Sequence, residues 1–464
     1  MRVLIGNHID PAIRDRGDLR AWTQRLLWFA QDGDLIVLCD VPDPRFLAYV
    51  TALTGVDPAS LHVLITPPGR FGGRLLDPDS LTSHQFLDAA REALTASDTR
   101  QVEEVFALWP SASVALFAAA LGLADRFPGA AFVAQSGGEL GNNKAAFRAL
   151  AAGAGVPIAP GAVCRSASEA IDATSTLLST AGAVVVKQAH NGAGVGNQLL
   201  VRDSMLAVDH VGARHLHHLD PGPDAIDVYW QERWDWASGE GRFPVVVEEF
   251  TPNATSLYSE HYAADTGTRP TEMGTLLYVC RRLSHQIVPL RDVDDKVRAQ
   301  LLDGGTRLAE TWRALGYRGH LSADAIATPD GRVLFTEVNA QVSGSLHIYQ
   351  VIAHRIVDTS ALPERSVVEY HVPPTWSVPD ADTFFAALTE LGCAWDANNR
   401  TGVIVSMPIV PLQPGLAQFV FCLAYATEAD RQTVWERLDA RFATVPASAY
   451  SASDHVGTPV HFAS

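Results

Sequence analysis

The sequence predicts a mixed α/β and α+β protein with three domains, and three observations point to this class. In residues 1–130, short apolar runs alternate with segments of helical periodicity, as in an α/β domain. From about residue 131, glycine-rich turns and a hairpin pattern predominate, which favours an α+β arrangement. After about residue 360, a proline-rich stretch precedes a smaller α+β region. We therefore expect domains at 1–130, 131–360 and 361–464.

The charge and apolar content of the chain indicate which kinds of partner it can bind. The chain has 464 residues, a formal net charge of −17, 47% apolar residues and 19% charged residues, so it can bury several cores. An acidic chain lacks the basic footprint that nucleic acids require, so we expect no nucleic-acid partner. Apolar runs stay below bilayer length and the first ten residues lack a signal-peptide pattern, so we expect no membrane partner.

Cysteine and lysine usage adds two expectations. The five cysteines are scattered singly, without a CxxC or Cys/His cluster, so neither a disulfide framework nor a zinc site is indicated and a cytoplasmic location is expected. Lysine occurs only at Lys144, Lys187 and Lys296. Because a compact ammonium and a planar guanidinium are not interchangeable, the retained lysines are candidates for specific chemistry.

The first domain is predicted to contain parallel strands joined by helices. RVLIGN (2–7) is typical of a buried strand, residues 18–31 have helical periodicity, and 34–40 and 61–66 are two further strands. The first strand is not followed by GxGxxG, which disfavours a dinucleotide-binding oxidoreductase.

Two lysines of the central region stand beside features that suit an anion. Lys144 follows Asn142 and Asn143, which can cap a helix over 145–155; a lysine in a first helical turn opposes the helix dipole unless it reaches an anion. Lys187 ends the strand 183–188, and HNGAGVGN (190–197) follows at once. Glycines allow backbone N–H groups to approach an anion, so this loop suggests bound phosphates. The alternatives are a solvated surface lysine at 144 and a flexible hairpin beside an exposed Lys187.

The glycine loop and a later strand contribute further candidates. The glycines of the loop are Gly192, Gly194 and Gly196, and no GK[ST] follows, so the loop is not a Walker A motif. The strand FPVVVEEF (243–250) ends in Glu248, Glu249 and Phe250 and could hold adenine, although an ordinary strand running into solvent is the alternative.

The segment 321–339 is the strongest local signal, because it predicts a hairpin that carries two acids and an amide. Glu337 and Asn339 share one strand face. A four-residue loop at 329–332 would place Asp324 directly opposite Glu337, whereas a three-residue loop would make them near neighbours. Like charges facing each other across strands need a cation between them, and Mg²⁺ prefers such hard oxygen ligands. The alternative is a solvated acidic hairpin end.

The remaining elements complete the predicted order. TLLYVCRRL (275–283) reads as one long strand ending in Arg281 and Arg282, and 297–316 is helical. The last domain should contain two strands between two helices, over 382–392, 402–410, 417–425 and 428–442.

The order of these motifs over about 140–350 resembles the ATP-grasp fold, in which two α+β subdomains grip ATP. The resemblance implies that Lys144 and Lys187 contact the nucleotide phosphates and that the 190–197 loop closes over them. It also implies an adenine hinge at Glu248, Glu249 and Phe250, and Mg²⁺ held by Asp324, Glu337 and Asn339. ATP and Mg²⁺ are the cofactors that this fold uses.

The segment EVNAQVSGSLHIY (337–349) is similar to the Glu-x-Asn-Ala-Arg-x-Ser-Gly segment of pheganomycin-type peptide ligases. Those enzymes also carry a pre-ATP-grasp α/β domain and a small C-terminal domain. Gln341 stands where that pattern has arginine, so Arg281 or Arg282 would have to supply a cation, and the analogy with other grasp enzymes selects Arg282. Ser343 and Gly344 could present N–H groups or a hydroxyl to an acyl oxygen, unless they form a plain turn.

The implied activity is ATP-dependent carboxylate–amine ligation through an acyl phosphate, forming a peptide bond in antibiotic or other secondary-metabolite biosynthesis. The implied partners are an amino-acid-like carboxylic acid and an amine or peptide, and a homodimer is left open. His347 could deprotonate the amine, although a lone histidine is more often structural. The alternative function is a nucleotide-binding protein that keeps the fold without catalysis.

Overall fold

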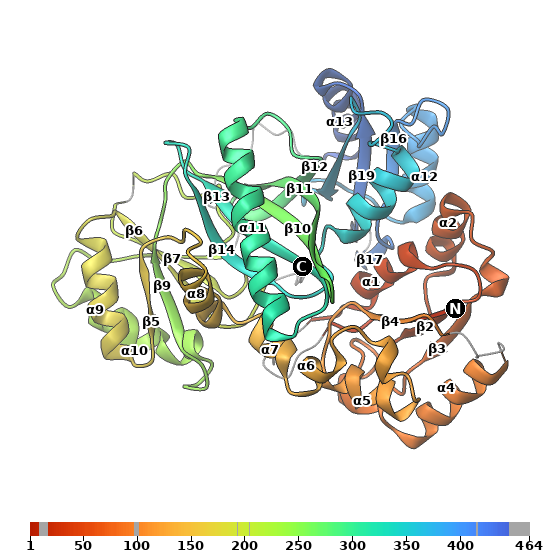
Figure 1. The fold of residues 1–464 in the computed structure, drawn as a ribbon. Helices are drawn as coiled ribbons and strands as arrows, with labels where there is room; N and C mark the ends of the chain where they lie inside the picture. The colour runs from red at the N-terminus through yellow and green to blue at the C-terminus, as the bar shows by residue number, and fades with distance from the viewer. Residues whose placement is uncertain (9–16, 97–101, 193, 204, 414–415, 445–464) are drawn as a thin grey trace.

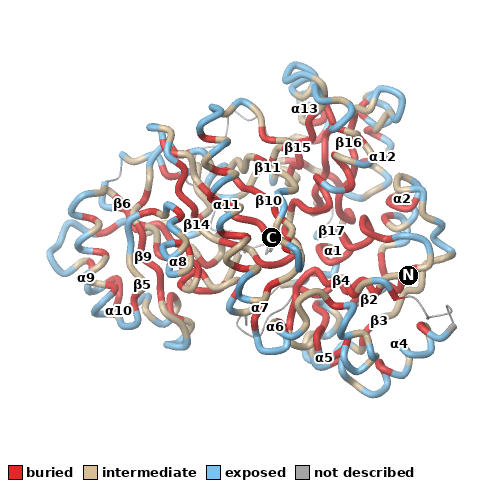
Figure 2. The backbone as a smooth tube through the Cα atoms, viewed as in Figure 1, coloured by how far each residue is buried: buried red, intermediate tan, exposed pale blue. Residues whose placement is uncertain are grey.

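The computed structural model describes residues 1–8, 17–96, 102–192, 194–203, 205–413 and 416–444. Three sheets organise the chain: a parallel sheet near the N-terminus, a five-stranded sheet, and an eight-stranded sheet that lies between them in Figure 1. The mixed α/β and α+β class is therefore confirmed. The buried stretches in Figure 2 follow the strands of these sheets and the helices packed on them.

The N-terminal sheet is parallel, as the alternating pattern predicts, with strand order β3-β2-β1-β4. The strands are β1 (Arg2–Ile5), β2 (Leu35–Leu38), β3 (His62–Ile65) and β4 (Glu104–Ala107). Alternate residues of β1 and β2 enter two different hydrophobic cores, which explains why β2 is apolar throughout. The surrounding helices are α2 (Pro44–Thr54), η2 (Pro58–Ser60), η3 (Gly69–Phe71), α3 (Pro78–Leu81), α4 (His84–Ala96), α5 (Ala112–Ala120) and η4 (Ala124–Arg126).

The helical segment predicted over 18–31 is a short α-helix followed by a tighter one. It comprises α1 (Arg20–Thr23) and the 3₁₀ helix η1 (Gln24–Phe29), and all six residues of η1 are buried. Arg25, which lies in η1, is 1% exposed. A segment that reads as amphipathic thus has a charged side chain inside the protein.

The five-stranded sheet has the order β5-β9-β6-β7-β8 and, with its helices, forms the first lobe of the central region. The strands are β5 (Gly161–Cys164), β6 (Ala183–Gln188), β7 (Asn197–Val201), β8 (His215–His218) and β9 (Val245–Glu249). Helices α9 (Ala167–Leu178) and α10 (Ala225–Ser238) cover one face, where Val184 and Val186 point. Strand alternation therefore directs Lys187 and Glu248 to the opposite face.

The eight-stranded sheet has the order β14-β13-β10-β11-β12-β15-β19-β16. Helix α11 (Asp295–Leu315) packs its apolar side on β10, β13 and β14. The strands are β10 (Thr255–Ala264), β11 (Gly267–Val279), β12 (Arg282–Val288), β13 (Gly319–Ala327), β14 (Val333–Asn339), β15 (Ser366–His371), β16 (Gly402–Val405) and β19 (Val420–Tyr425).

Strands β15, β16 and β19, which follow residue 360, belong to this same sheet, because β15 pairs with β12 and with β19 and β19 pairs with β16. Helices α12 (Ala381–Glu390) and α13 (Glu428–Phe442) pack with the last strands in a core of their own. The predicted domain boundaries stay predictions, and the boundary at 360 falls between hydrogen-bonded strands of one sheet. The other short elements are α6 (Ala130–Ala134), α7 (Gly137–Gly141), α8 (Lys144–Gly153), the π-helix η5 (Ile348–Val357), β17 (Val410–Gln413) and β18 (Leu416–Gln418).

One predicted strand is wrong, and one central strand was not predicted. TLLYVCRRL is two strands, because Cys280 and Arg281 have φ of 48° and 64° and form the turn between β11 and β12. Strand β10 lies in the middle of the sheet, yet both of its faces mix polar and apolar residues, so its alternation gives no signal.

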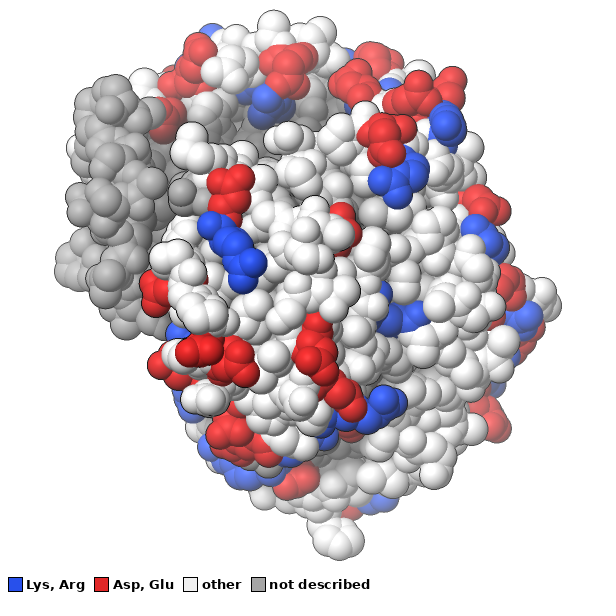
Figure 3. Space-filling view, turned by 90° about the vertical axis from the view of Figure 1, so that its left-hand side faces the viewer, with Lys and Arg blue, Asp and Glu red and all other residues white. Residues whose placement is uncertain are grey.

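The surface shows two further properties. On the face drawn in Figure 3, basic and acidic side chains are interspersed rather than gathered by sign. Among the described helices, none combines the length and the apolar character that a membrane crossing would require.

Candidate active site between the two lobes

The two predicted lysines meet the acidic hairpin where the five-stranded and eight-stranded sheets approach each other. Lys144 begins helix α8 after Asn143, whose side chain accepts from Ala145 N and Ala146 N, so the predicted cap is confirmed. The Nζ atom of Lys144 lies 2.8 Å from Glu337 Oε2. The Nζ atom of Lys187 donates to Thr336 O at 3.4 Å. Both lysines are 6% exposed, and the Lys187 contact joins the five-stranded sheet to the hairpin.

Asp324 does lie directly opposite Glu337 in the hairpin, but the turn has three residues rather than four. Thr328 N donates to Arg332 O at 2.9 Å, which leaves only 329–331 in the turn. A bulge between Asp324 and Ala325 then shifts the register by one residue and places Asp324 across from Glu337. The loop is thus the three-residue alternative, and the bulge makes Asp324 and Glu337 direct partners rather than the near neighbours expected for that loop.

The two carboxyl groups have opposite pKa shifts. Burial, and then the charge of Glu337, raise the pKa of Asp324 well above its ordinary value. Burial would also raise the pKa of Glu337, but Lys144 and Lys187 outweigh it and hold that pKa below its ordinary value. Asn339 Nδ2 donates to Asp324 Oδ2 at 3.1 Å. The two lysines therefore favour the negative charge on Glu337 over Asp324.

This donor set fits Mg²⁺ bound together with a phosphate group. Asp324, Glu337 and Asn339 offer hard oxygen ligands from one face of the hairpin. The two facing carboxyl groups have the Lys144 ammonium beside them, where a metal cation could also compensate their charge. Within the described ranges, no group of three or more His, Cys, Asp or Glu side chains is placed to hold a metal. Mg²⁺ commonly takes only one or two carboxylates and completes its shell with water and phosphate oxygens, so these residues suit it better than a fully protein-enclosed ion.

The side chain of Glu248 contacts two cations, whereas we expected it beside adenine. Its buried carboxylate forms ion pairs with Lys187 and, at 2.9 Å, with Arg148 Nη1. These two cations already engage the carboxylate that we expected beside adenine. Arg148 lies one helical turn after Lys144 on α8, and this i, i+4 spacing is the signal that could have revealed it.

The rest of the predicted adenine hinge lies at the end of β9. Glu249 N donates to Pro160 O at 2.8 Å, and Phe250 N donates to Ala183 O at 3.2 Å. The Phe250 ring is 3% exposed and lies 5.8 Å from the His210 ring, centroid to centroid. The hinge role of these residues stays a prediction.

The glycine loop is the turn between β6 and β7. Gly194 has a φ of +68°, and a Cβ there would lie 2.8 Å from the backbone of Gly212. A Cβ at Gly196 would lie 2.9 Å from Asn191 Cβ, so both positions need glycine. Lys144 Nζ donates to Asn191 O, which places the start of the loop, before Gly192, beside this lysine. Binding of phosphates by the loop stays a prediction.

The arginine pair occupies a hairpin turn, so strand alternation cannot decide which side chain points inward. Arg281 Nη1 lies 2.6 Å from Asp209 Oδ1, and Arg281 N donates to Asp209 O at 2.9 Å. Arg282 is exposed at the start of β12. Burial, with the nearby charge of Arg282, lowers the pKa of Arg214, a neighbouring cation that the sequence did not reveal. A catalytic role for Arg282 stays a prediction.

The segment that follows the hairpin is buried and densely hydrogen-bonded. Ser343 Oγ lies 3.0 Å from Ser345 Oγ, and Ser345 Oγ donates to Glu260 Oε1. Burial raises the pKa of the Glu260 carboxyl to about 7, against the hydrogen bonds from the serines. Gln341 is 6% exposed, and no described residue partners its Oε1 atom. Glu260, on the unpredicted β10, is a member of the site that sequence reasoning missed.

His347 lies behind this segment. It is fully buried with Nε2 3.6 Å from Glu369 Oε1, and burial lowers its pKa despite that carboxylate. The position is that of a structural histidine.

A groove of about 1170 Å³ lies elsewhere, and none of the predicted site residues is among the described residues that line it. Its walls come from the N-terminal sheet, from 124–132 and from the ends of β10 and α11, including Glu104, Phe132, Tyr262 and Arg318. This groove is thus separate from the lysine and carboxylate cluster.

Comparisons with known proteins agree with this arrangement. Residues 23–123 match the family model described as "Pre ATP-grasp domain". No match was found among curated proteins. An ADP complex of N5-carboxyaminoimidazole ribonucleotide synthetase is 12% identical, with a TM-score of 0.56 over 94% of this chain and 97% of that one. A complex of biotin carboxylase from Campylobacter jejuni with an ATP ligand is 13% identical, with a TM-score of 0.57 over 95% and 91%.

An L-amino acid ligase from Bacillus licheniformis is also similar in structure. It is 12% identical, with a TM-score of 0.53 over 95% of this chain and 97% of that one. Similarity at this level of identity shows the fold. The chain therefore carries an N-terminal pre-ATP-grasp domain followed by the two-lobed ATP-grasp fold, which confirms the architecture that the resemblance implied.

Proposed function

We propose that this protein is an ATP-dependent carboxylate–amine ligase that forms a peptide bond through an acyl phosphate. The observation that carries the proposal is the cluster in which Lys144 of α8 and Lys187 of the five-stranded sheet meet the Asp324–Glu337 pair of the hairpin. Phosphoryl transfer needs cations at the phosphates and a metal site beside them, and this cluster offers both. The shared fold with an L-amino acid ligase supports the same class of reaction.

The reaction has two balanced steps. A carboxylate oxygen of the acid forms a bond to the γ-phosphorus of ATP while the bond from that phosphorus to the β–γ bridging oxygen breaks, giving acyl phosphate and ADP. The amine nitrogen then bonds to the acyl carbon, the bond from that carbon to the phosphate oxygen breaks, and inorganic phosphate leaves. The amine loses one proton in the second step, and the product is an amide.

The chain's own residues would act through charge and exclusion of water. Lys144 and Lys187 would neutralise the phosphoryl oxygens, and the loop containing Gly192, Gly194 and Gly196 would cover them and keep water from the acyl phosphate. Asp324, Glu337 and Asn339 would hold Mg²⁺, which supplies further charge neutralisation at the phosphates when bound. Lys144 would then exchange its contact with Glu337 for a phosphate oxygen.

The remaining roles rest on the sequence resemblance. We assign Glu248, Glu249 and Phe250 to the adenine side, with the contact made by the backbone rather than by the Glu248 carboxylate, which two cations engage. Arg282 would supply the cation that Gln341 lacks, and Ser343 and Gly344 would face the acyl oxygen. The substrates would be an amino-acid-like acid and an amine or peptide, in a cytoplasmic pathway that makes antibiotics or other secondary metabolites.

A second candidate is a nucleotide-binding protein without catalysis, and the buried Gln341 in place of arginine favours it. Release of ADP separates the two functions. The ligase should release ADP from ATP and Mg²⁺ only when a substrate acid is present, and hydroxylamine should trap the acyl phosphate as a hydroxamate detectable by mass spectrometry. A panel of amino acids as acid and amine would identify the amide product. Nucleotide binding without ADP release for any acid would support the second candidate.

A further inference from the structure

Arg25 is a buried cation bonded to the backbone of the segment after the acidic hairpin. Its Nη1 donates to Ser343 O at 2.5 Å, and its Nη2 donates to Val342 O at 3.2 Å. The side chain comes from η1 of the pre-ATP-grasp domain and contacts a segment 318 residues further along the chain. Val342 N also donates to Leu108 O at 3.1 Å, so the N-terminal domain holds this segment at two points.

Burying this guanidinium is costly, and its surroundings compensate only in part. Burial lowers the pKa of Arg25 to about 9, although the charges of Glu369 and Glu260 act against this effect. The Trp22 ring lies 4.5 Å from the guanidinium carbon, which adds a cation–π contact. Arg25 Nε has no hydrogen-bond partner among the described residues. A cation kept at such cost needs a reason beyond packing.

The direction of two carbonyl groups fixes the direction of two N–H groups. In a planar trans peptide the carbonyl and the following N–H point in opposite directions. Because the carbonyls of Val342 and Ser343 point to Arg25, the N–H groups of Ser343 and Gly344 point away from it. No described residue accepts a hydrogen bond from either N–H group. Two successive N–H groups held this way form a site for negatively charged oxygen.

We infer that Arg25 is a positioning residue that orients the N–H groups of Ser343 and Gly344 toward the acyl oxygen of the substrate. This inference rests on the proposed function. A cation bonded to the two carbonyls also polarises both peptide groups, which strengthens their N–H groups as donors to a developing oxyanion. Gln341 stands where the peptide-ligase pattern has arginine. Arg25 would partly replace that positive charge, because it acts on the substrate through the peptide groups that it contacts.

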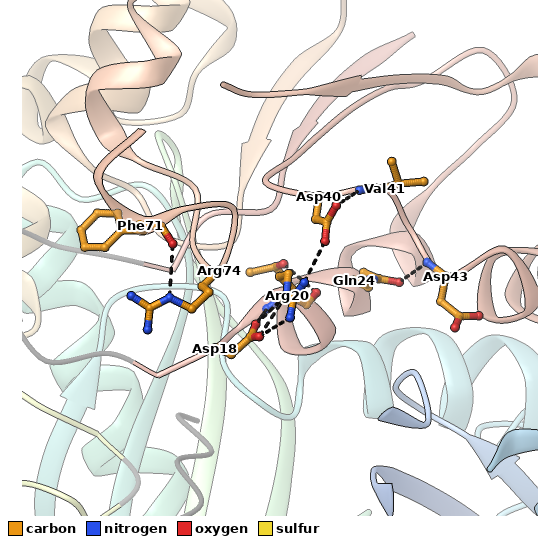
Figure 4. A network of polar contacts seen from close by, with 9 residues as sticks. Asp18, Arg20, Gln24, Asp40, Val41, Asp43, Phe71 and Arg74 are labelled. Atoms are coloured by element: carbon orange, nitrogen blue, oxygen red, sulfur yellow. Dashed lines mark hydrogen bonds and ion pairs between the residues drawn. The ribbon is translucent and has the colours of Figure 1, made fainter. Parts of the chain in front are cut away.

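The N-terminal domain is built to hold Arg25 in place. Figure 4 shows the contacts at the start of its segment, where Arg20 bonds to Asp18 and to Asp40. In the next turn, Gln24 Oε1 accepts from Asp43 N at 2.8 Å. At the far end, Trp28 Nε1 donates to Ser406 O at 2.8 Å. Hydrogen bonds of Gln24 and Trp28 therefore hold the backbone on both sides of Arg25, as a positioning role requires.

The test compares Arg25→Gln with a matched control, Arg2→Gln. Arg2 belongs to the same domain and also bonds to a backbone carbonyl and a carboxylate, Phe29 O and Asp34, but it does not contact the 342–343 segment. Three quantities are measured for each variant: binding of a non-hydrolysable ATP analogue, acid-dependent ADP formation, and hydrogen exchange of residues 341–346. In Arg25→Gln we expect kcat to fall about 100-fold, with a smaller change in KM for the acid and unchanged analogue binding. Exchange at 341–346 should rise, and the control should resemble wild type in all three.

Arg25→Lys is the second variant, and it also serves if the glutamine variant does not fold. Lysine keeps the charge but cannot hold two carbonyls as a planar fork, so kcat should lie between those of the wild type and Arg25→Gln. A folded Arg25 variant with kcat within about twofold of wild type, or with kcat and analogue binding lost in parallel, would overturn the inference. If the wild type itself forms no ADP with any acid, the proposed function fails, and unchanged exchange at 341–346 in the variants would separately overturn the role of Arg25.

Discussion

The Asp324–Glu337 cluster and the Arg25–Glu260 cluster are neighbours, since Glu260 of β10 lies on the same face of the sheet as Asp324 and Glu337, yet they are organised in different ways. At Asp324 and Glu337, charged side chains pair with one another, and the side chain of Glu337, which contacts Lys144, keeps 20% exposure. Around Arg25 and Glu260, the side chains are buried and bond to backbone carbonyls and a serine hydroxyl, while Arg25 Nε and Glu260 Oε2 have no partner among the described residues. Pairs of the first kind can exchange partners when a ligand enters, whereas groups of the second kind keep theirs. The first cluster suits binding and the second suits positioning.

The largest effect should follow from Glu337→Gln, which removes one hard anionic ligand with little change in volume. Turnover should fall by about 1000-fold, because the metal site and its match to Lys144 are both lost. The melting temperature without nucleotide should fall as well, because the buried Lys144 ammonium loses its ion-pair partner. Steady-state ADP formation and a thermal melt measure the two effects, with Glu310→Gln on the exposed side of α11 as the control. Full activity in Glu337→Gln would remove the metal role.

Lys187→Ala should weaken binding of a non-hydrolysable ATP analogue by about 100-fold, measured by calorimetry. The truncation removes a buried ammonium and leaves Glu248 with Arg148 alone. Lys296→Ala is the matched control, since Lys296 lies in the first turn of α11 and is exposed. An unchanged dissociation constant for Lys187→Ala would exclude its contact with nucleotide.

Glu260→Gln tests the second cluster through the pH dependence of the unfolding free energy. Because the folded pKa of about 7 lies above the ordinary 4.5, folded wild type binds this proton more tightly than the unfolded chain does. The stabilisation is complete below pH 4.5 and is lost as pH rises through about 7. Glutamine imitates the protonated form at every pH, so the unfolding free energy of the variant relative to wild type should improve by about 2 kcal/mol between pH 5 and pH 7. Urea denaturation at both pH values measures this shift, and a constant difference would place the Glu260 pKa near its ordinary value.

The smallest expected effects concern the arginine turn. Arg282→Ala should lower single-turnover ADP formation by about tenfold, since it removes the exposed cation that the sequence resemblance assigns to the site. Arg281→Ala should be milder, because Arg281 is engaged with Asp209. Equal rates close to wild type would mean that neither arginine replaces the cation absent at Gln341, and Arg214 would become the next side chain to substitute.

The sequence predicted the binding cluster better than the positioning cluster. Lys144, Lys187 and the Asp324–Glu337 pair each carry a local pattern: a helix cap, a strand end with glycines, or an alternating hairpin. The bulge beside Asp324 leaves no such pattern, because an extra residue in a strand changes register without changing composition. Arg25 resembles any arginine of an amphipathic helix, and its partners lie too far along the chain for spacing to reveal them.

The middle of the large sheet was equally hard to predict. Strand β10 carries Tyr258 and Glu260 on one face and Ser259 and His261 on the other, so neither face is apolar. Its place between β11 and β13 is decided by pairing with distant strands. The arginine turn was misread because Cys280 and Arg281 adopt positive φ without glycine, which only the surrounding contacts can impose.

The pairing of β12 with β15 limits how this chain can be re-engineered. A truncation near residue 360 would expose the edge of β12 and leave Gln286 without the Glu369 carboxylate that it contacts at 2.7 Å. An uncovered strand edge invites aggregation with other chains. Grafting a foreign C-terminal region to change substrate preference would therefore succeed only if the graft kept β15, with the seam placed after His371 rather than at the proline-rich stretch.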